Sequence, residues 1–429
     1  MNGNKIMRII VLGSGGREHS IIWKLSLDKR VKEIISFGEN YGISNLSKMI
    51  SIDQSNLNKV VQKIISLKPD LVIVGPEEPL SNGIINILSQ NNIKSFGPTK
   101  EAARIESSKV FSKKLMIENS IPTAFAEFFE DFNKAKKYCL TKGYENIVIK
   151  ADGLAAGKGV FLPNSEKEMI KILDDLLIKN KLGKSGRSIL IEDRIFGKEV
   201  SVFCFTDGTN YSKPIAICDY KRVFENELGP NTGGMGCYTP PEFWSEKLEK
   251  NILEKIIEPT INAMKEKKST FKGMLYTGLM ITDQGPKVIE YNCRFGDPEC
   301  ELIMPMFKGN ILDTFIQVAN SNLKESSVEW KNQKGVCVVI CSEGYPEKYK
   351  KEIEISGIDR LEENIICFHS GTKIKNKKIV SNGGRVLVLA NIDDSIKNCR
   401  DNIYSEIKKI SFEKSFYRKD IALRALEND

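Results

Sequence analysis

Histidine is scarce in this chain, and the cysteines follow no metal-binding pattern. The 429 residues include two histidines, His19 and His369, and ten cysteines with no CxxC spacing. A structural zinc site needs several such ligands at short, regular spacing, so the sequence argues against one. We interpret the cysteines as reduced thiols of the core and expect a cytoplasmic protein.

Long apolar runs are also missing. Met7 to Leu12 is a short apolar stretch that leads directly into a glycine turn, which is not the form of a signal peptide. No apolar segment of 18 residues occurs, so the sequence predicts no membrane-spanning helix. We therefore expect no membrane partner.

Positive charge is present but not concentrated. The formal net charge is +8, yet the 64 Lys and Arg residues are spread along the chain, and the densest short run is Lys373 to Lys378. A nucleic-acid-binding protein more often gathers this charge on one face, with aromatic residues between the cations. We expect no nucleic-acid partner, and we expect small anionic substrates instead.

The order of the elements predicts an α/β protein of several domains. The chain is longer than one core usually supports. Apolar strands alternate with helical patterns from Ile6 onward, as at Leu71 to Gly83 and Ser95 to Thr99, which predicts a parallel sheet. We predict an N-terminal α/β substrate-binding domain over residues 1–105, a central nucleotide-binding domain over 106–325 and a C-terminal β-rich α+β domain over 326–429.

The stretch VIKADGLAAGKGV, residues 148–160, restricts the chemistry most tightly. Its glycines, including Gly153 and Gly157, would let backbone N–H groups approach phosphate oxygens, while Lys150 and Lys158 would neutralise the anion. It is not a Walker loop, because Gly159 stands where a Ser or Thr would follow the lysine. The alternative is a flexible glycine hairpin with surface lysines.

A second glycine turn, GSGGREHS, follows the first predicted strand. Gly15 and Gly16 would expose N–H groups at a helix N-terminus, where Arg17 could add a contact to an anion. A dinucleotide-binding turn would have Gly in place of Glu18, so a phosphorylated substrate fits better than NAD. Glu39 stands where a ribose-binding acid would be, which leaves NAD open.

Residues 125–195 read as strand, helix, strand, helix, strand, which predicts a small lid hinged at both ends over a nucleotide. Lys109 could be a further phosphate ligand or ordinary helix surface. The backbone of Glu192, Asp193 and Ile195 could contact an adenine edge, and Glu199 could bind ribose hydroxyls. The alternative for this segment is an ordinary sheet edge.

A predicted hairpin, Gly273 to Ile281 and Lys287 to Glu299, carries the densest group of polar residues. Strand alternation puts Glu290 and Asn292 on one face, and a carboxylate with an amide oxygen suits magnesium. Arg294, Asp297 and Glu299 follow at the strand end, although Glu299 could pair structurally with Arg294.

Three other segments carry weaker expectations. Glu227 to Pro241 is rich in glycine and proline and predicts a long functional loop. Ser245 to Lys268 predicts one long amphipathic helix. The residues after Glu325 look like a separate unit with a terminal helix, and we expect packing and closure there rather than chemistry.

Together these stretches resemble phosphoribosylamine–glycine ligases (glycinamide ribonucleotide synthetases), an ATP-grasp family of purine synthesis. The matching motifs run from the first strand to the last helix: VLGSGGREHS, IVGPEEPL, FGPT, VIKADGLAAGKGV, GPNTGGMG, VIEYNCRFGDPE, GGRVL and FYRKDIALRAL. The resemblance implies an N-terminal pre-ATP-grasp domain, an ATP-grasp domain with a lid at about 125–195, and a monomer that acts on glycine, 5-phosphoribosylamine and ATP.

The resemblance also implies roles for individual residues. ATP would contact Lys109, Lys150, Gly153, Gly157, Lys158, Glu192, Asp193, Ile195 and Glu199. Mg²⁺ or Mn²⁺ would bind Glu290 and Asn292, and the catalytic residues would be Arg294, Lys158 and Asp297. The substrates would contact Gly15, Gly16, Arg17, Glu18, Pro76, Asp219, Asn231, Thr232, Gly233, Gly234, Met235, Arg294, Asp297, Pro298 and Glu299, although Asp219 could instead be a strand-end cap.

The implied reaction begins when a glycine carboxylate oxygen attacks the γ-phosphate, which gives glycyl phosphate and ADP. The amine of phosphoribosylamine then displaces phosphate. Two alternatives stay open: an ATP-dependent ligase for another amino acid or amine, and a nucleotide-sensing module without turnover. The family's pattern is not complete here, because Gly278 stands where many ATP-grasp enzymes have a further acid and Tyr220 where His is common.

Overall fold

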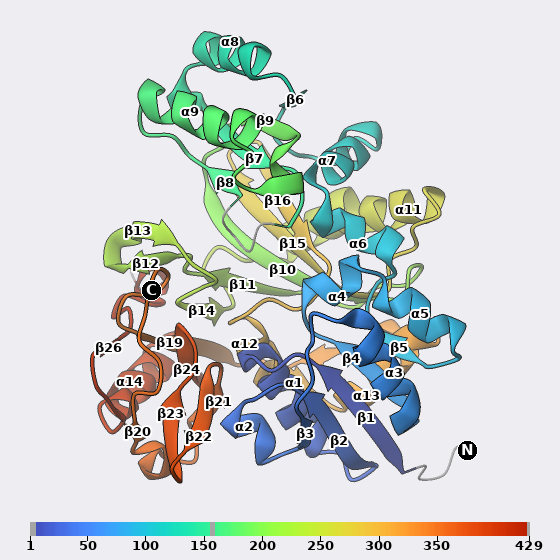
Figure 1. Cartoon of the computed structure of the whole chain (residues 1–429), viewed down its shortest axis with the longest axis vertical. Coiled ribbons are helices and arrows are strands. Elements are labelled where there is room, and N and C mark those ends of the chain that lie inside the picture. The colour runs from blue at the N-terminus through green and yellow to red at the C-terminus, as the bar shows by residue number, and fades with distance from the viewer. Residues whose placement is uncertain (1–5, 155–158, 427–429) are drawn as a thin grey trace.

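The computed structural model describes residues 6–154 and 159–426 (Figure 1). Its first unit is a parallel sheet in the order β3-β2-β1-β4-β5, as the alternating pattern predicted. Helices cross between the strands because parallel neighbours cannot be joined by a tight turn. The strands are β1 (Met7–Leu12), β2 (Val31–Phe37), β3 (Lys48–Ile50), β4 (Leu71–Val74) and β5 (Ser95–Phe96), and the helices are α1 (Gly16–Ser26), α2 (Tyr41–Ser44), α3 (Leu57–Leu67), α4 (Glu77–Ser81), α5 (Ile84–Gln90) and α6 (Lys100–Ser107).

A small unit follows helix α7 (Lys109–Glu118) and stands at the top of Figure 1. Its four strands are ordered β6-β9-β7-β8, and its own apolar core includes Ile147, Ile149 and Leu173. The predicted order of strand, helix, strand, helix, strand is confirmed, with one additional short strand. The elements are β6 (Ala126–Phe129), α8 (Phe132–Lys142), β7 (Ile147–Ala151), β8 (Val160–Phe161), α9 (Glu166–Leu173) and β9 (Ile189–Asp193).

A nine-stranded sheet forms the centre of the molecule, in the order β16-β15-β10-β11-β14-β19-β24-β21, with β26 paired to β19. The predicted hairpin is present as β15 and β16. The strands are β10 (Lys198–Thr206), β11 (Ile215–Asp219), β14 (Gly236–Thr239), β15 (Gly273–Thr282), β16 (Gly285–Asn292), β19 (Lys334–Ser342), β21 (Ile366–His369), β24 (Arg385–Asp393) and β26 (Ser415–Phe416). Around this sheet lie the hairpin β12 (Arg222–Phe224) and β13 (Leu228–Asn231), the pair β17 (Phe307–Lys308) and β18 (Glu329–Trp330), and the helices α10 (Glu246–Ile252), α11 (Glu258–Glu266), α12 (Cys300–Met306) and α13 (Ile311–Ala319).

The sequence suggested that the last part of the chain is a separate unit, and the structure shows that it is not. Strand β19 pairs along β14, so the C-terminal strands extend the central sheet. The expected terminal helix is also wrong, because α14 (Ile396–Ile407) is followed by two short strands and a 3₁₀ turn, Leu423–Ala425. The remaining strands are β20 (Ile355–Ser356), β22 (Thr372–Lys375), β23 (Lys378–Ser381) and β25 (Ser411–Phe412).

The structure confirms one of two other predicted segments and divides the second. The long helix expected over Ser245 to Lys268 is continuous from Glu246 to Glu266, with α10 and α11 joined by a π-helical turn at Leu253–Ile257. Pro259, which lacks a backbone N–H donor, lies just after this turn, where the helical hydrogen-bond pattern changes. The expected loop over Glu227 to Pro241 contains strands β13 and β14.

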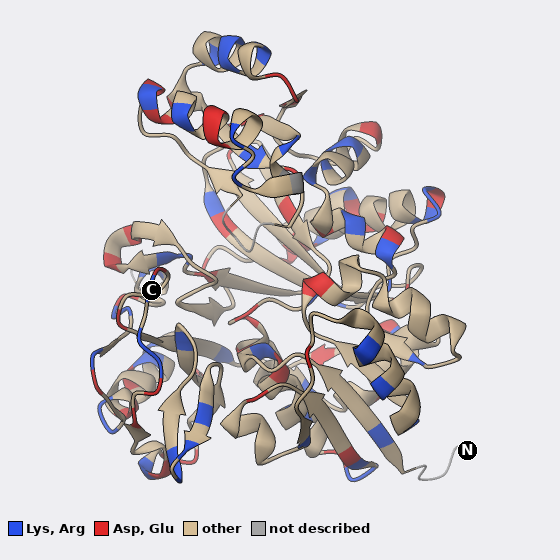
Figure 2. Cartoon of the chain, viewed as in Figure 1, with Lys and Arg blue, Asp and Glu red and all other residues tan. Residues whose placement is uncertain are grey.

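Charge is distributed over the whole fold. Figure 2 shows patches of Lys and Arg and patches of Asp and Glu in all parts of the fold. Within residues 6–154 and 159–426, no helix combines the length and the apolar character that crossing a bilayer requires.

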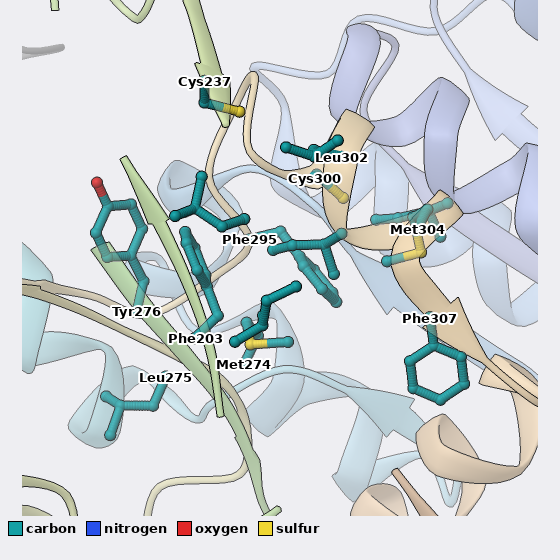
Figure 3. Close-up of a cluster of buried hydrophobic side chains, with 14 of the residues drawn as sticks. Phe203, Cys237, Met274, Leu275, Tyr276, Phe295, Cys300, Leu302, Met304 and Phe307 are labelled. Carbon is teal, nitrogen blue, oxygen red and sulfur yellow. The ribbon is translucent and has the colours of Figure 1, made fainter. Parts of the chain in front are cut away.

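Apolar side chains, including the aromatic rings of Phe203, Phe295 and Phe307, pack together in the core (Figure 3). Phe205 of β10 is fully buried, and its ring lies 5.8 Å from the ring centre of Phe295 and 6.2 Å from those of Phe96 and Phe307. Edge-to-face packing at these separations is favourable. Because Phe96 belongs to β5, this cluster ties the first sheet to the large one.

We predict that Phe205→Ala lowers the free energy of unfolding by about 3–5 kcal/mol, because the cavity it leaves is enclosed by rings from both sheets. Urea denaturation followed by circular dichroism measures this loss. The matched control is Phe224→Ala, since Phe224 is 54% exposed; its change should stay within about 0.5 kcal/mol. Equal urea midpoints for Phe205→Ala and Phe224→Ala would contradict the role of the aromatic cluster in joining the two sheets.

Candidate active site

Glu290 lies near the end of β16, directly across from Gly278 on β15. Four cations surround its carboxylate: Lys221, Lys150, Lys109 and Arg294. Burial alone would raise the pKa of Glu290, yet these charges hold it below its ordinary value. Glu290 is therefore an ionised carboxylate in a partly buried, strongly positive environment.

Two of these cations come from the small unit and the helix before it. Lys150 Nζ on β7 donates to the Ile289 carbonyl at 3.0 Å and pairs with Glu192 at 2.9 Å. Lys109 Nζ donates to the Gly153 carbonyl at 3.0 Å. Lys109, Lys150, Gly153 and Glu192 thus meet at the edge of β16. The predicted residues Gly157 and Lys158 lie outside the described residues.

Lys113 belongs to the same cluster and was not predicted from the sequence. It is 1% exposed, and its Nζ lies 3.2 Å from Glu192. Burial lowers the pKa of Lys113 to about 8. Lys113 stands four residues after Lys109, a spacing that places both on one face of α7 and could have identified it.

Lys221 is the second cation that the sequence reading missed. It contacts Glu199 on β10 and lies 3.8 Å from Asp219 on β11. Burial opposes its charge, but these two carboxylates raise the pKa of Lys221 well above its ordinary value. It sits in the turn between β11 and β12.

Arg294 follows β16 and binds two acids from the first unit. Its Nε pairs with Glu77 at 3.1 Å and its Nη2 with Glu106 at 3.0 Å. Arg17 lies 3.9 Å from the same Glu77 carboxylate and 2.6 Å from Glu18. Glu77, which follows the predicted Pro76, was missed because its nearest partner, Arg294, is 217 residues away along the chain.

The glycine turn before α1 is shaped around Glu18. The Gly15 N–H donates to a Glu18 carboxylate oxygen at 2.7 Å, which caps the helix. A Cβ on Gly75 would approach Glu18 Oε1 to 2.0 Å, so this acid fits only against a glycine. Glu18 therefore closes the turn that a dinucleotide-binding loop would leave open for a third glycine.

A chain of hydroxyl groups links Asp219 to Glu299. Ser201 Oγ lies 3.4 Å from Asp219 Oδ1 and donates to the Tyr276 hydroxyl, which in turn donates to Glu299 Oε1 at 3.2 Å. Burial and the charge of Asp219 raise the pKa of Glu299 to about 7. Glu299 thus contacts Tyr276. The alternative, an ion pair between Glu299 and Arg294, is not found among the residues that the structure describes.

The predicted loop around residues 231–235 packs on the Asp297–Pro298 turn. Thr232 N donates to the Lys221 carbonyl at 2.7 Å, and Met235 N donates to the Tyr220 carbonyl at 2.8 Å. Gly234 has φ +116°, and a Cβ there would meet Pro298 Cδ at 2.4 Å. Glycine is therefore required for this close approach.

A polar cavity of about 320 Å³ lies between the first unit and the C-terminal strands. Gly15, Gly16 and Glu39 line one side, and Asp297 and Arg385 line the other. The size suits a small polar metabolite. Arg385 was not among the predicted site residues, because nothing in its own segment indicated chemistry.

Some predicted residues lie away from this cluster. Asp193 pairs with Lys142 at 2.9 Å on the partly exposed side of β9, and Ile195 is half-buried on the connection to β10. Asn231 is exposed and pairs with Arg222 in the β12–β13 hairpin. Tyr220 supports the end of the chain, since its hydroxyl accepts from Ala422 N at 2.9 Å.

Comparison with known families and structures agrees with this arrangement. Three consecutive segments match the phosphoribosylglycinamide synthetase models: residues 7–106 the N domain, 107–300 the ATP-grasp (A) domain and 335–424 the C domain. A phosphoribosylamine–glycine ligase of Caldanaerobacter subterraneus subsp. tengcongensis is 42% identical over 97% of this chain and 99% of its own length.

Solved structures give the same result. The crystal structure of phosphoribosylamine–glycine ligase from Thermotoga maritima superposes with a TM-score of 0.84 at 31% identity, covering 97% of this chain and 100% of the other. A biotin carboxylase from Campylobacter jejuni shares only the fold, with a TM-score of 0.75 at 17% identity over 100% of this chain and 96% of its own. The chain therefore belongs to the phosphoribosylglycinamide synthetase (phosphoribosylamine–glycine ligase) family of ATP-grasp ligases.

Proposed function

We propose that this protein joins glycine to 5-phosphoribosylamine at the expense of ATP, giving glycinamide ribonucleotide, ADP and phosphate in purine biosynthesis. The observation that supports this most strongly is the partly buried, ionised Glu290, whose pKa is lowered by cations from three different parts of the fold. Such a cluster attracts a polyphosphate and stabilises charge during phosphoryl transfer.

ATP would lie between the small unit and the central sheet. Lys109 and Lys150 would contact its phosphates together with Gly153, Gly157 and Lys158, while Glu192, Asp193 and Ile195 would border the adenine and Glu199 the ribose. Residues 125–195 would act as the lid. This placement fits the position of Lys150, which reaches from β7 to the Ile289 carbonyl of β16.

Glu290 and Asn292 would hold Mg²⁺ or Mn²⁺. One carboxylate and one amide oxygen on the same face of β16 suit a hard cation that keeps several waters and shares phosphate oxygens. A metal bound there would neutralise charge on the nucleotide phosphates. Gly278 faces Glu290 across the sheet and offers no side-chain ligand, so these two side chains are the protein ligands that we propose.

The proposed reaction has two steps. A glycine carboxylate oxygen attacks the γ-phosphorus, and the bond to the β,γ-bridging oxygen breaks, which gives glycyl phosphate and ADP. The neutral amine of phosphoribosylamine then attacks the glycyl carbonyl, phosphate leaves, and the nitrogen loses a proton. Arg294 and Lys158 would stabilise the transferring group, and Asp297 would orient the acceptor.

The substrates other than ATP would occupy the opposite end of the site. Gly15, Gly16, Arg17, Glu18 and Pro76 would receive the sugar phosphate, since the N-terminus of α1 favours an anion. Asp219, Thr232 to Met235, Asn231 and the Asp297 to Glu299 turn would hold glycine and the sugar. The 320 Å³ cavity beside Gly15 and Asp297 supports this assignment.

We also propose the division into residues 1–105, 106–325 and 326–429, with strands of the third segment continuing the central sheet, together with a monomeric enzyme and a cytoplasmic location. One chain contributes all of the proposed site residues, so the reaction requires no second copy. All ten cysteines are unpaired, which suits a reducing compartment.

Phosphate release tests the proposed function directly. We expect release of phosphate from ATP only when glycine and phosphoribosylamine are both present, with equal amounts of ADP. Turnover with a different amino acid or amine and none with glycine would favour another ligase. Nucleotide binding without release of ADP under any of these conditions would favour a sensing module.

We predict that Glu290→Gln lowers kcat by at least about 10²-fold, the scale found when one preorganised charge stabiliser is removed. Steady-state release of ADP measures the loss, and circular dichroism checks that the variant is folded. The matched control, Glu329→Gln, removes a surface carboxylate that is 60% exposed and paired only with Lys308. Unchanged turnover of Glu290→Gln would remove the proposed metal site.

Glu299 should make folding depend on pH. Its pKa is about 7 in the folded chain against an ordinary value of 4.5, so the folded state binds the extra proton between these values. Its contribution to stability is therefore full below about pH 4.5 and is lost as the pH rises through 7. Relative to Glu299→Gln, the wild type should lose stability from pH 5 to pH 8 in urea denaturation. Parallel pH profiles for the two proteins would contradict the raised pKa.

A further inference from the structure

Arg385, the first residue of the C-terminal strand β24, lies where three separate segments meet. Its Nη1 donates to the Asp297 carbonyl at 2.6 Å and to the Gly233 carbonyl at 2.7 Å. Its Nη2 pairs with the Asp297 carboxylate at 2.8 Å, and the side chain is 18% exposed. One guanidinium group therefore holds both the glycine-rich loop and the turn after β16.

The C-terminal segment holds Gly233 through a second contact. The Gly233 N–H donates to the Tyr345 hydroxyl at 3.1 Å, so Tyr345 and Arg385 bind opposite ends of the same residue. A Cβ on Gly233 would lie 3.0 Å from the guanidinium carbon. The loop backbone thus packs directly on the arginine, which a side chain at this position would prevent.

The loop and the turn also contact each other. Gly234 packs against Pro298, while Asp297 carries the carboxylate that Arg385 binds. Glycine backbone has wide conformational freedom, so such a loop needs external contacts to keep one conformation. Arg385 provides these contacts with a rigid, planar set of donors.

The position of Arg385 connects these contacts with one end of the site. Arg385 and Asp297 line the 320 Å³ cavity together with Gly15 and Gly16 at the start of α1. The lysines of the nucleotide side, Lys109 and Lys150, instead contact Gly153, Glu192 and Ile289. Arg385 thus lies at the end of the site assigned to the sugar phosphate and glycine.

We propose that Arg385 is a positioning residue that fixes the Gly233–Gly234 loop and Asp297 for binding of glycine and phosphoribosylamine, without a role in binding ATP. This inference rests on the proposed function. It gives the C-terminal segment a part in substrate recognition, whereas the sequence had indicated only packing and closure.

The test compares Arg385→Lys with the wild type in steady-state kinetics. Lysine keeps the charge but cannot bind two carbonyls and a carboxylate with one planar group. We expect the KM of glycine or of phosphoribosylamine, formed in the assay from ribose 5-phosphate and ammonia, to rise at least about tenfold, which corresponds to one charge-assisted hydrogen bond. The KM of ATP should change less than about twofold, which corresponds to a free energy far smaller than that of one such bond.

Two further variants separate positioning from a general loss of structure. Guanidinium ion added to Arg385→Ala should restore part of the rate, and Tyr345→Phe should raise the same KM values by a smaller factor. The matched control is Arg360→Lys, because Arg360 is an exposed C-terminal arginine that also donates to a backbone carbonyl, that of Lys409 at 2.9 Å; its kinetics should equal the wild type.

Wild-type kinetics for Arg385→Lys, or an equal rise in the KM of ATP and of the other substrates, would overturn the proposal. If Arg385→Ala does not fold, the KM values of Arg385→Lys and Tyr345→Phe still decide whether the proposal holds. Failure of the proposed function would look different, since the wild type itself would then release no phosphate in response to glycine and phosphoribosylamine.

Discussion

The site depends on one partly buried carboxylate, Glu290, that stays ionised because of the cations near it. Burial of a lone charge is costly, and only close opposite charges and hydrogen bonds offset that cost. Here the cations come from α7, from β7, from the turn after β11 and from the end of β16. The electrostatics of one residue thus require the small unit, the central sheet and the connections between them to be placed correctly together.

Three of these four cations also form ion pairs with other acids, which extends the network. Lys150 pairs with Glu192, Lys221 contacts Glu199, and Arg294 pairs with acids of the first unit. Ion pairs that cross between units restrain their relative position, because separating them would leave buried charges uncompensated. An incoming polyphosphate would compete with these acids for the lysines. The lysines would then exchange contacts with acids, which stabilise the free protein, for contacts with phosphate.

The sequence predicted what depends on local pattern. Alternating strands and helices indicated the parallel sheet, the polar strand end indicated Glu290, Asn292 and Arg294, and the glycine turns indicated where backbone approaches closely. The sequence did not identify Glu77, Lys221 or Arg385. Glu77 and Arg385 have partners far along the chain, and Lys221 reaches Glu199 because β10 pairs with β11. The C-terminal strands were judged separate for the same reason: only the fold reveals that β19 pairs with β14.

We propose that this charged site transfers the γ-phosphoryl group of ATP to a carboxylate oxygen of glycine. Glycine labelled with ¹⁸O in its carboxylate gives the sharpest test, with mass spectrometry of the phosphate released in the presence of ATP and phosphoribosylamine. Each phosphate should carry one ¹⁸O, because the oxygen that attacks the γ-phosphorus leaves with it. Release of unlabelled phosphate would show that the glycine carboxylate is not phosphorylated.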